Sequence, residues 1–451
     1  MKKIVLLPLL ISLVICFILT GCGQSETTPS IPTTTAPTST TPTSTTPATT
    51  TPAVTQPTTE KELKIGMILD LSGSHAIEIM DIQLLLAEMD NAKGGVKIGN
   101  DYYKIKIIPY TNDNDMNKGV AAMNRLVFED GVKFVISHAM LPDFVCPIAE
   151  PEKVITFSNG AIWNTGLLEK WHYNFTLLGQ GTHEVSVAAW LIDNYPEIKG
   201  PNGLVMALPD NAPGHQGAAI ISMPYKSLGA KPQLVFFPAD QRDLSSLGTK
   251  IATMNPAWYM GNVGKVEDVA LATTAAYDAG YRGHNFTFVT SETELLAPIF
   301  KPEVLEGFVC GASAMEFEPA ITEYAQAIKD ARIAKVGKWD CLDYMSTPCY
   351  TALKVAMQKA GSIDVDAVAA ALHQGGFEFL VPDGIGMMIT RPDMRLDGAC
   401  VDAVIDNVIK VIRNRKPEVL AKFSPEKSLE YVRRAYPPLA PGQTPSIVNP
   451  E

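Results

Sequence analysis

Polar side chains gather in six short segments that directly follow apolar, strand-like runs of the sequence. In open parallel α/β sheets, ligands bind outside the carboxyl ends of the strands, so these side chains are candidates for contact with a ligand. Their hydroxyl, amide, imidazole and carboxylate groups can hydrogen-bond a small polar solute. His75, His138 and His215 could pair with a ligand carboxylate, or each is a loop histidine at the surface. The segments are 72–76, 138–143, 158–162, 210–215, 261–264 and 291–294.

The spacings that catalysis or metal binding require are absent from the sequence. His183-Glu184 would need a second histidine at position 187 to form a zinc-binding helix, and that residue is Val187. There is no phosphate-binding G-x-x-x-x-G-K-[ST] loop, no G-x-S-x-G elbow and no Cys-x-x-Cys pair. The turn 112–115 has the oxygen ligands of a calcium loop, but no bidentate Glu follows in register. We therefore predict no catalytic residues, no cofactor and no metal site.

The elements that position the six segments alternate between strand and helix, which is typical of parallel sheets with helices on both faces. Strands are expected at 64–71, 103–110, 134–137, 154–157, 204–208, 234–237, 258–260, 285–289 and 307–312. Helices are expected at 78–91, 117–130, 142–149, 214–228, 244–254, 266–279 and 402–413, with a further helix capped by Thr347 and ended by Gly361. The pattern restarts near residue 204, so it predicts two sheets in two lobes with a cleft between them.

The first 60 residues have the pattern of a targeting signal followed by a tether. A basic start and a short apolar run precede Leu19-Thr20-Gly21-Cys22, which resembles a bacterial lipobox. This predicts a signal peptide at 1–21 and lipidation of Cys22; the alternative is an ordinary signal peptide with a chance cysteine. Residues 22–60 are rich in Thr, and proline recurs every five residues from Pro32 to Pro57. Such a segment has little to bury, and we predict a disordered tether.

Composition excludes several classes of protein. The 451 residues carry 37 Lys and Arg against 48 Asp and Glu, a net charge of −11, which argues against nucleic acid as the main partner. Five cysteines remain besides Cys22 and the signal-peptide Cys16, too few for a disulfide scaffold. Cys341 and Cys349 could form a bridge, or they are buried thiols.

Several stretches, taken in order, resemble the type I periplasmic solute-binding proteins of the branched-chain amino-acid (Leu/Ile/Val) ABC transporter family. The resemblance covers most of residues 63 to about 396, and its motifs are 65–73 (I-G-M-I-L-D-L-S-G), 91–96 (N-A-K-G-G-V), 130–136 (D-G-V-K-F-V-I) and 305–308 (L-E-G-F). It implies an α/β fold of two Rossmann-like lobes with parallel sheets and a central cleft, joined by three crossovers and closing on a ligand like a hinge. It also implies delivery of a solute to an ABC permease, with no chemistry on the ligand.

The resemblance implies a set of ligand contacts. Glu292 matches the acidic residue that meets a ligand ammonium, although it could instead be a first-turn residue stabilised by the helix dipole. Residues 158–161 match the loop whose backbone N–H groups grip a carboxylate, or they are a tight turn. The chain departs from the family at Ile162, at 138–141, at Gly214 and His215, and at Asn262, where hydroxyls or aromatic rings are expected. The predicted ligand-binding residues are Ser74, His75, His138, Met140, Ser158, Asn159, Gly160, Ala161, Asn211, Asn262 and Glu292.

The resemblance also implies an organisation and two alternative roles. The predicted first lobe is 61–182 with about 313–380, the second is 183–312 with about 381–435, and 436–451 is a loose tail. The leading role is a membrane-tethered, monomeric, extracytoplasmic substrate-binding lipoprotein of an ABC importer for an amino acid or a related amide or carboxylate. The alternative is a ligand-binding sensor that signals through a partner protein.

Overall fold

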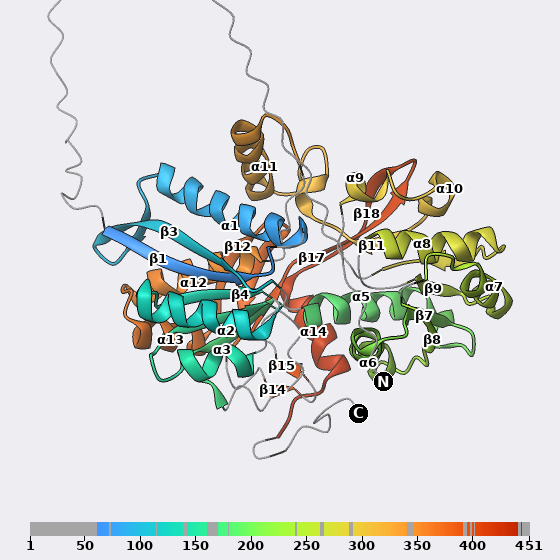
Figure 1. The fold of residues 1–451 in the computed structure, drawn as a ribbon, viewed down its shortest axis with the longest axis horizontal. Coiled ribbons are helices and arrows are strands. Elements are labelled where there is room, and N and C mark those ends of the chain that lie inside the picture. Colours follow the sequence, from blue (N-terminus) through green and yellow to red (C-terminus); the bar gives the residue numbers. More distant parts are fainter. Residues whose placement is uncertain are drawn as a thin grey trace, which may run out of the picture. The chain divides into compact units, whose positions relative to one another are not determined.

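Figure 1 shows the fold of the chain in a computed structural model. The described residues are 61–71, 74–113, 115–138, 142–159, 170–178, 180–239, 241–261, 266–287, 292–340, 346–390, 395–396, 399–400, 402–440 and 443.

The first sheet has the strand order β2-β3-β1-β4-β5-β6. All neighbouring pairs are parallel except β2 with β3, which form an antiparallel edge. The predicted strands are confirmed, whereas β2 and β6 were not predicted. The strands are β1 (Lys61–Leu69), β2 (Val96–Ile98), β3 (Asp101–Thr111), β4 (Phe134–His138), β5 (Ile155–Asn159) and β6 (Asn174–Leu178).

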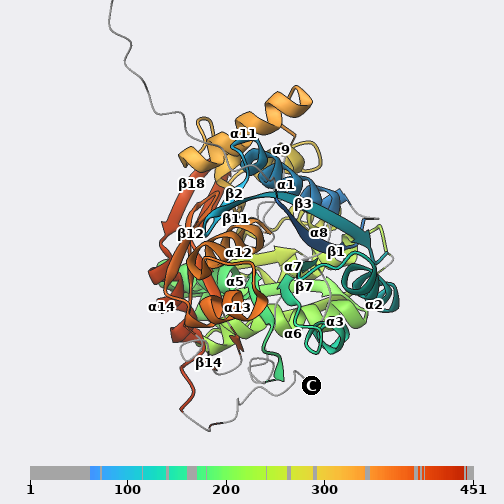
Figure 2. The ribbon, with the colours of Figure 1, turned by 90° about the vertical axis from the view of Figure 1, so that its left-hand side faces the viewer.

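Helices cover both faces of this sheet, because successive side chains of β1 point to opposite sides. Met67 and Leu69 pack in one core with α1, α12 and α13, while Ile68 packs in another with α2 and α3. Figure 2 shows α12 and α13 on one side of the strands and α2 and α3 on the other. This explains why the strand reads as a continuous apolar run. The helices are α1 (Ser74–Ala92), α2 (Met116–Asn124), followed by a π-helix (Arg125–Glu129), α3 (Pro142–Ala149), α12 (Thr347–Ala360) and α13 (Val365–Gln374).

The second sheet repeats this design with the order β10-β9-β7-β8, all parallel. Leu204, Met206 and Leu208 face α5 and α6, whereas Val205 and Ala207 face α7 and α8. The predicted strands at 204–208, 234–237 and 258–260 and the predicted helices at 214–228, 244–254 and 266–279 are confirmed. The strand predicted at 285–289 is described as the two-residue strand β10, and α5, α9, α10 and the 3-10 helix were not predicted. The elements are α5 (Gln180–Asn194), a 3-10 helix (Pro196–Lys199), β7 (Leu204–Pro209), α6 (Ala212–Ser227), β8 (Gln233–Phe237), α7 (Ser245–Met254), β9 (Trp258–Gly261), α8 (Val266–Asp278), β10 (His284–Asn285), α9 (Thr293–Leu296) and α10 (Pro302–Leu305).

The predicted helix at 402–413 is wrong, because this segment forms two strands. Val404, Val408 and Ile409 are buried, and β17 is buried along almost its whole length. β-Branched residues on consecutive positions suit a strand that is covered on both faces. β17 belongs to the antiparallel sheet β11-β17-β18, and β16 belongs to the antiparallel sheet β12-β13-β16. Their bounds are β11 (Val309–Gly311), β12 (Phe377–Val381), β13 (Gly384–Met388), β16 (Ala403–Ile405), β17 (Asn407–Arg413) and β18 (Lys416–Phe423).

The remaining elements are small or lie near the end of the chain. α14 packs against α5, and after it Tyr436 and Leu439 are buried while Pro438 forms an isolated bridge with Leu396. The first residues of the predicted tail therefore contact the body. These elements are η3 (Ala314–Glu316), α11 (Glu323–Val336), β14 (Arg395–Leu396), β15 (Ala399–Cys400) and α14 (Pro425–Ala435).

Each of the two main cores is built from residues far apart in the sequence. The core of the first sheet combines residues between 63 and 177 with residues between 314 and 403. The core of the second combines residues between 187 and 309 with residues between 409 and 431. The first core includes Val381, Met388 and Ala403, which the predicted boundaries assign to the second lobe. The lobe boundaries themselves remain a prediction.

The bridge between Cys341 and Cys349 is wrong, since Cys349 is a free thiol inside the first core. Burial raises the pKa of Cys349 to about 12, and that of Cys146 and Cys310 likewise to about 12. The alternative of a buried thiol holds for Cys349, and Cys146 and Cys310 are buried free thiols as well.

A buried carboxyl holds the segment that passes from the second core to the first. Asp383, in the turn between β12 and β13, is 1% exposed, and its Oδ1 accepts a hydrogen bond of 2.7 Å from the backbone N–H of Ala314. Burial raises the pKa of Asp383 to about 8, against the opposing effect of that hydrogen bond. At neutral pH the folded protein therefore keeps a proton that the unfolded chain has released.

We expect Asp383→Asn to reduce the loss of stability that accompanies rising pH. Between the unfolded pKa of 3.8 and about 8, the raised pKa destabilises the fold by up to about 1.4 kcal/mol per pH unit. Below this window both states are protonated, and above it the cost is constant. Asn can still accept the Ala314 bond but does not titrate. Urea unfolding at several pH values checks this, and equal slopes in both proteins would contradict it; Glu184, whose pKa is also raised to about 8, contributes equally to both.

Candidate functional site

The carboxyl ends of β1, β4 and β5 meet at one edge of the first sheet. Ile68 is in register with Ser137, and Ser137 with Ser158, so the strands end side by side. His138 and Asn159 are themselves register partners. The predicted contacts of the first lobe thus belong to one edge of the sheet. The backbone positions described there are Ser74 and His75 at the start of α1, and His138, Ser158 and Asn159 at strand ends; Met140, Gly160 and Ala161 lie outside the described residues.

At the corresponding edge of the second sheet, Asn211 has a structural role. It is the N-cap of α6, and its Oδ1 accepts a hydrogen bond of 2.7 Å from the N–H of Gly214. His215 is exposed, hydrogen-bonds Asp210 at 2.8 Å and stacks on Phe236. The alternative of a surface histidine therefore holds for His215. Asn262 lies outside the described residues.

Glu292 is the predicted site residue whose described side chain is buried. It is 5% exposed and precedes α9, yet its carboxylate makes no hydrogen bond to that helix. Glu292 occupies the N-cap position of α9 without a capping hydrogen bond from its side chain, and stabilisation by the helix dipole stays an open alternative. Its Oε2 accepts a hydrogen bond of 3.1 Å from the indole Nε1 of Trp339. A buried carboxylate beside an aromatic ring is suited to binding a cationic group.

Trp339 is a site residue that the sequence analysis missed. It lies 47 residues beyond Glu292, in the loop that follows the left-handed C-cap Gly337 of α11. The adjacent Asp340 receives two hydrogen bonds from Arg332, at 2.6 and 2.9 Å, and Arg332 also binds Asp81 of α1. Bidentate pairs of this kind fix geometry, so the loop that carries the indole is held in place. The sequence signal was a lone tryptophan between Lys338 and Asp340.

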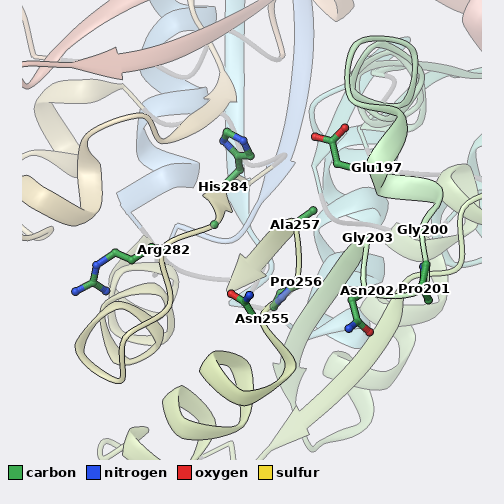
Figure 3. A pocket seen from close by; sticks show the side chains of 11 residues that line it. Glu197, Gly200, Pro201, Asn202, Gly203, Asn255, Pro256, Ala257, Arg282 and His284 are labelled. Atoms are coloured by element: carbon green, nitrogen blue, oxygen red, sulfur yellow. The ribbon is translucent and has the colours of Figure 1, made fainter.

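A groove of about 680 Å³ lies at the opposite, amino-terminal edge of the second sheet (Figure 3). Two of its polar side chains, Arg282 and His284, are engaged by the fold. Arg282 donates to the carbonyls of Tyr277 and Tyr281, and His284 stacks on Trp258. We therefore place the candidate ligand site at the carboxyl edge, around Glu292. The groove is lined by Glu197, Gly200, Pro201, Asn202, Gly203, Asn255, Pro256, Ala257, Arg282, Gly283 and His284.

The fold and the site define a class: α/β binding proteins with two parallel sheets whose strand ends carry polar groups for a small solute. The sequence profile of the periplasmic binding protein family matches residues 62–401, so the chain belongs to this family, a class of solute-binding proteins and not of enzymes. Membership indicates a location outside the cytoplasm. Within the described part of the chain, every helix is too short or too polar to cross a membrane.

Solved structures show the same fold at low sequence identity. A leucine binding protein from Thermotoga maritima has a TM-score of 0.60 at 18% identity, covering 81% of this chain and 99% of its own. A branched chain amino acid ABC transporter periplasmic ligand-binding protein from Burkholderia xenovorans has 0.63 at 16%, covering 81% and 96%. A solute binding protein of an ABC transporter from Rhodopseudomonas palustris, in complex with 3,4-dihydroxy benzoic acid, has 0.59 at 16%, covering 81% and 98%. No curated protein matches the sequence.

Proposed function

We propose that the protein is the substrate-binding component of an ABC importer and that it binds an α-amino acid or a closely related amine. The observation that carries this proposal is the buried carboxylate of Glu292 beside the Trp339 indole. A carboxylate in a buried, partly desolvated position interacts strongly with an opposite charge. A ligand ammonium is such a charge.

The similar structures support this class of ligand and leave a second one open. Two of them are described as leucine or branched-chain amino-acid binding proteins, and another holds an aromatic carboxylate. In this chain, a ligand that carries only a carboxylate would place a second negative charge near Glu292. Like charges in a desolvated site repel, so the amino acid is favoured.

Binding is proposed to proceed by closure of two lobes around the solute. The backbone N–H groups of the segment after β5 would receive the ligand carboxylate, while Glu292 would receive its ammonium from the other side. Closure removes water from both contacts, which strengthens them. The closed state would be the one that the permease recognises, with the protein acting as a monomer.

A thermal-shift screen of residues 61–451 tests the proposal. A ligand that binds only the folded state raises the melting temperature by mass action, equivalent to about 2.7 kcal/mol at a hundredfold excess over Kd. The panel contains the twenty amino acids, small amides, polyamines, and aliphatic and aromatic carboxylates. A rise with an α-amino acid supports the proposal. A rise confined to carboxylates without an amine would refute the ammonium contact, and no rise with any compound would refute the proposed ligand class.

Membrane attachment is proposed to depend on Cys22, which lies outside the described residues. Lipidation of this residue, followed by the tether at 22–60, would hold the body near the membrane surface. We expect Cys22→Ser to move the protein from the membrane fraction to the soluble extracytoplasmic fraction, with Cys349→Ser as the control that stays on the membrane. Membrane retention of Cys22→Ser would show that another feature anchors the chain.

A further inference from the structure

A buried ion pair contacts Thr293, the residue that follows Glu292 in the sequence. Lys410 on β17 is 0% exposed and Glu316 in η3 is 3% exposed. The Nζ of Lys410 lies 2.7 Å from both carboxylate oxygens of Glu316. Removing two charges from water is expensive, and a pair of apolar residues of similar volume is often as stable. The pair therefore calls for an explanation other than stability.

Glu316 also holds the start of α9. Its Oε2 accepts hydrogen bonds from the backbone N–H of Thr293, at 3.0 Å, and from the Thr293 Oγ1, at 2.9 Å. Thr293 is the first residue of this four-residue helix, and Glu292 immediately precedes it. The first N–H groups of a helix need hydrogen-bond acceptors. Here Glu316 accepts from the N–H of Thr293, whereas the Glu292 side chain makes no capping hydrogen bond.

Glu292 is thus fixed from two directions. Its backbone is held through Thr293 by Glu316, and its carboxylate is held by the Trp339 indole. Glu316 is itself fixed, because η3 is capped by the Ser313 side chain and because the N–H of Ala314 binds Asp383. A side chain that must meet a ligand at one place needs this kind of support around it.

We propose that Glu316 and Lys410 are positioning residues that set the direction of Glu292, so that the site selects ligands with an ammonium group over those without one. This inference rests on the proposed function, in which Glu292 meets the ammonium. Glu316 orients the Glu292 carboxylate, Lys410 holds Glu316 in place through the ion pair, and Thr293 connects them to the site.

The first test needs no ligand. Hydrogen exchange of the amides of 292–297 is measured in the full soluble chain for wild type, Glu316→Gln and Thr293→Val. Thr293→Val removes the hydrogen bond from the hydroxyl to Glu316 and keeps the one from the backbone N–H. It replaces Glu316→Gln as the test variant if Glu316→Gln folds poorly. We expect exchange of these amides to become roughly tenfold faster in Glu316→Gln, the size of a lost hydrogen bond to a charged group, and less so in Thr293→Val. Thr351→Val, which removes a buried hydroxyl bond in α12, is the matched control and leaves 292–297 unchanged.

The second test compares two ligands by calorimetry: leucine and its deaminated analogue, which has the same carbon skeleton and carboxylate without the ammonium. We expect Glu316→Gln to weaken the binding of leucine roughly tenfold and Thr293→Val to weaken it less. Both variants should weaken the binding of the analogue by less than about twofold. Equal losses for both ligands would mean a merely structural role. If wild type binds neither leucine nor any other compound of the thermal-shift panel, the proposed function fails. Unchanged exchange of 292–297 in Glu316→Gln overturns the positioning role in either case, so the two failures are distinguishable.

Discussion

Lys410→Met is expected to destabilise the protein by about 3–5 kcal/mol, because it leaves the buried carboxylate of Glu316 without its cation. The lysine is fully buried in β17, so water cannot take over its role. The total free energy of unfolding of a typical domain is about 5–15 kcal/mol, so this one change would remove a large share of it. Urea unfolding at neutral pH, followed by circular dichroism, measures the effect.

Two further proteins make this experiment decisive. Lys301→Met breaks a pair with Asp278 that is about half exposed, and such surface pairs contribute only about 0–1 kcal/mol. The double variant Lys410→Met/Glu316→Leu removes both buried charges and should recover much of the loss. A loss below about 1 kcal/mol for Lys410→Met, similar to that of Lys301→Met, would show that the buried pair contributes no more than a surface one.

Glu292→Gln is expected to weaken binding of an α-amino acid by roughly 30-fold or more. The variant keeps the shape of the side chain but leaves the desolvated ammonium without its opposite charge, which costs about 2–5 kcal/mol. Glutamine can still accept the indole bond from Trp339, so the fold should remain intact. Calorimetric titration with the amino acid that gives the largest thermal shift provides the measurement.

The neighbouring Glu294→Gln is the matched control. It removes a carboxylate of the same type from an exposed position in the same short helix, and it should change affinity by less than about twofold. If Glu292→Gln and Glu294→Gln behave alike, the contribution of Glu292 is only long-range electrostatics. In that case the ammonium contact must be assigned elsewhere.

The two parallel sheets could be predicted from sequence because their strands are short, apolar on both faces and bounded by polar turns. β1 and β7 meet these conditions, and both were predicted. β17 does not meet these conditions, because Lys410 and Arg413 interrupt its apolar run. The remaining apolar residues then have a spacing that resembles a helix. The burial of β17 depends on β11 and β18, which are remote in the sequence, and local patterns carry no record of such pairing.

Within the candidate site, the sequence could supply Glu292 but neither Trp339 nor Glu316. Glu292 stands in a motif with a recognisable place after a strand. Glu292 precedes β11 in the sequence, whereas Glu316 and Trp339 follow it. Only folding brings these two residues close to Glu292. Asn211 shows the opposite limit: its position after β7 suggested a ligand contact, whereas its geometry is that of a helix cap.

The interleaved composition of the two cores bears on how the chain acquires its structure during export. The first sheet lacks the apolar layer of α12 and α13 until residues after 347 arrive, and the second lacks Ile409, Val411 and Tyr431 until still later. Neither half can therefore complete its interior while the chain is still emerging, and the contacts that close both are of long sequence separation. Such topologies fold slowly and leave apolar faces exposed in the meantime. We therefore expect the chain to remain incompletely folded until its last strands are available, a state that is compatible with passage through a membrane.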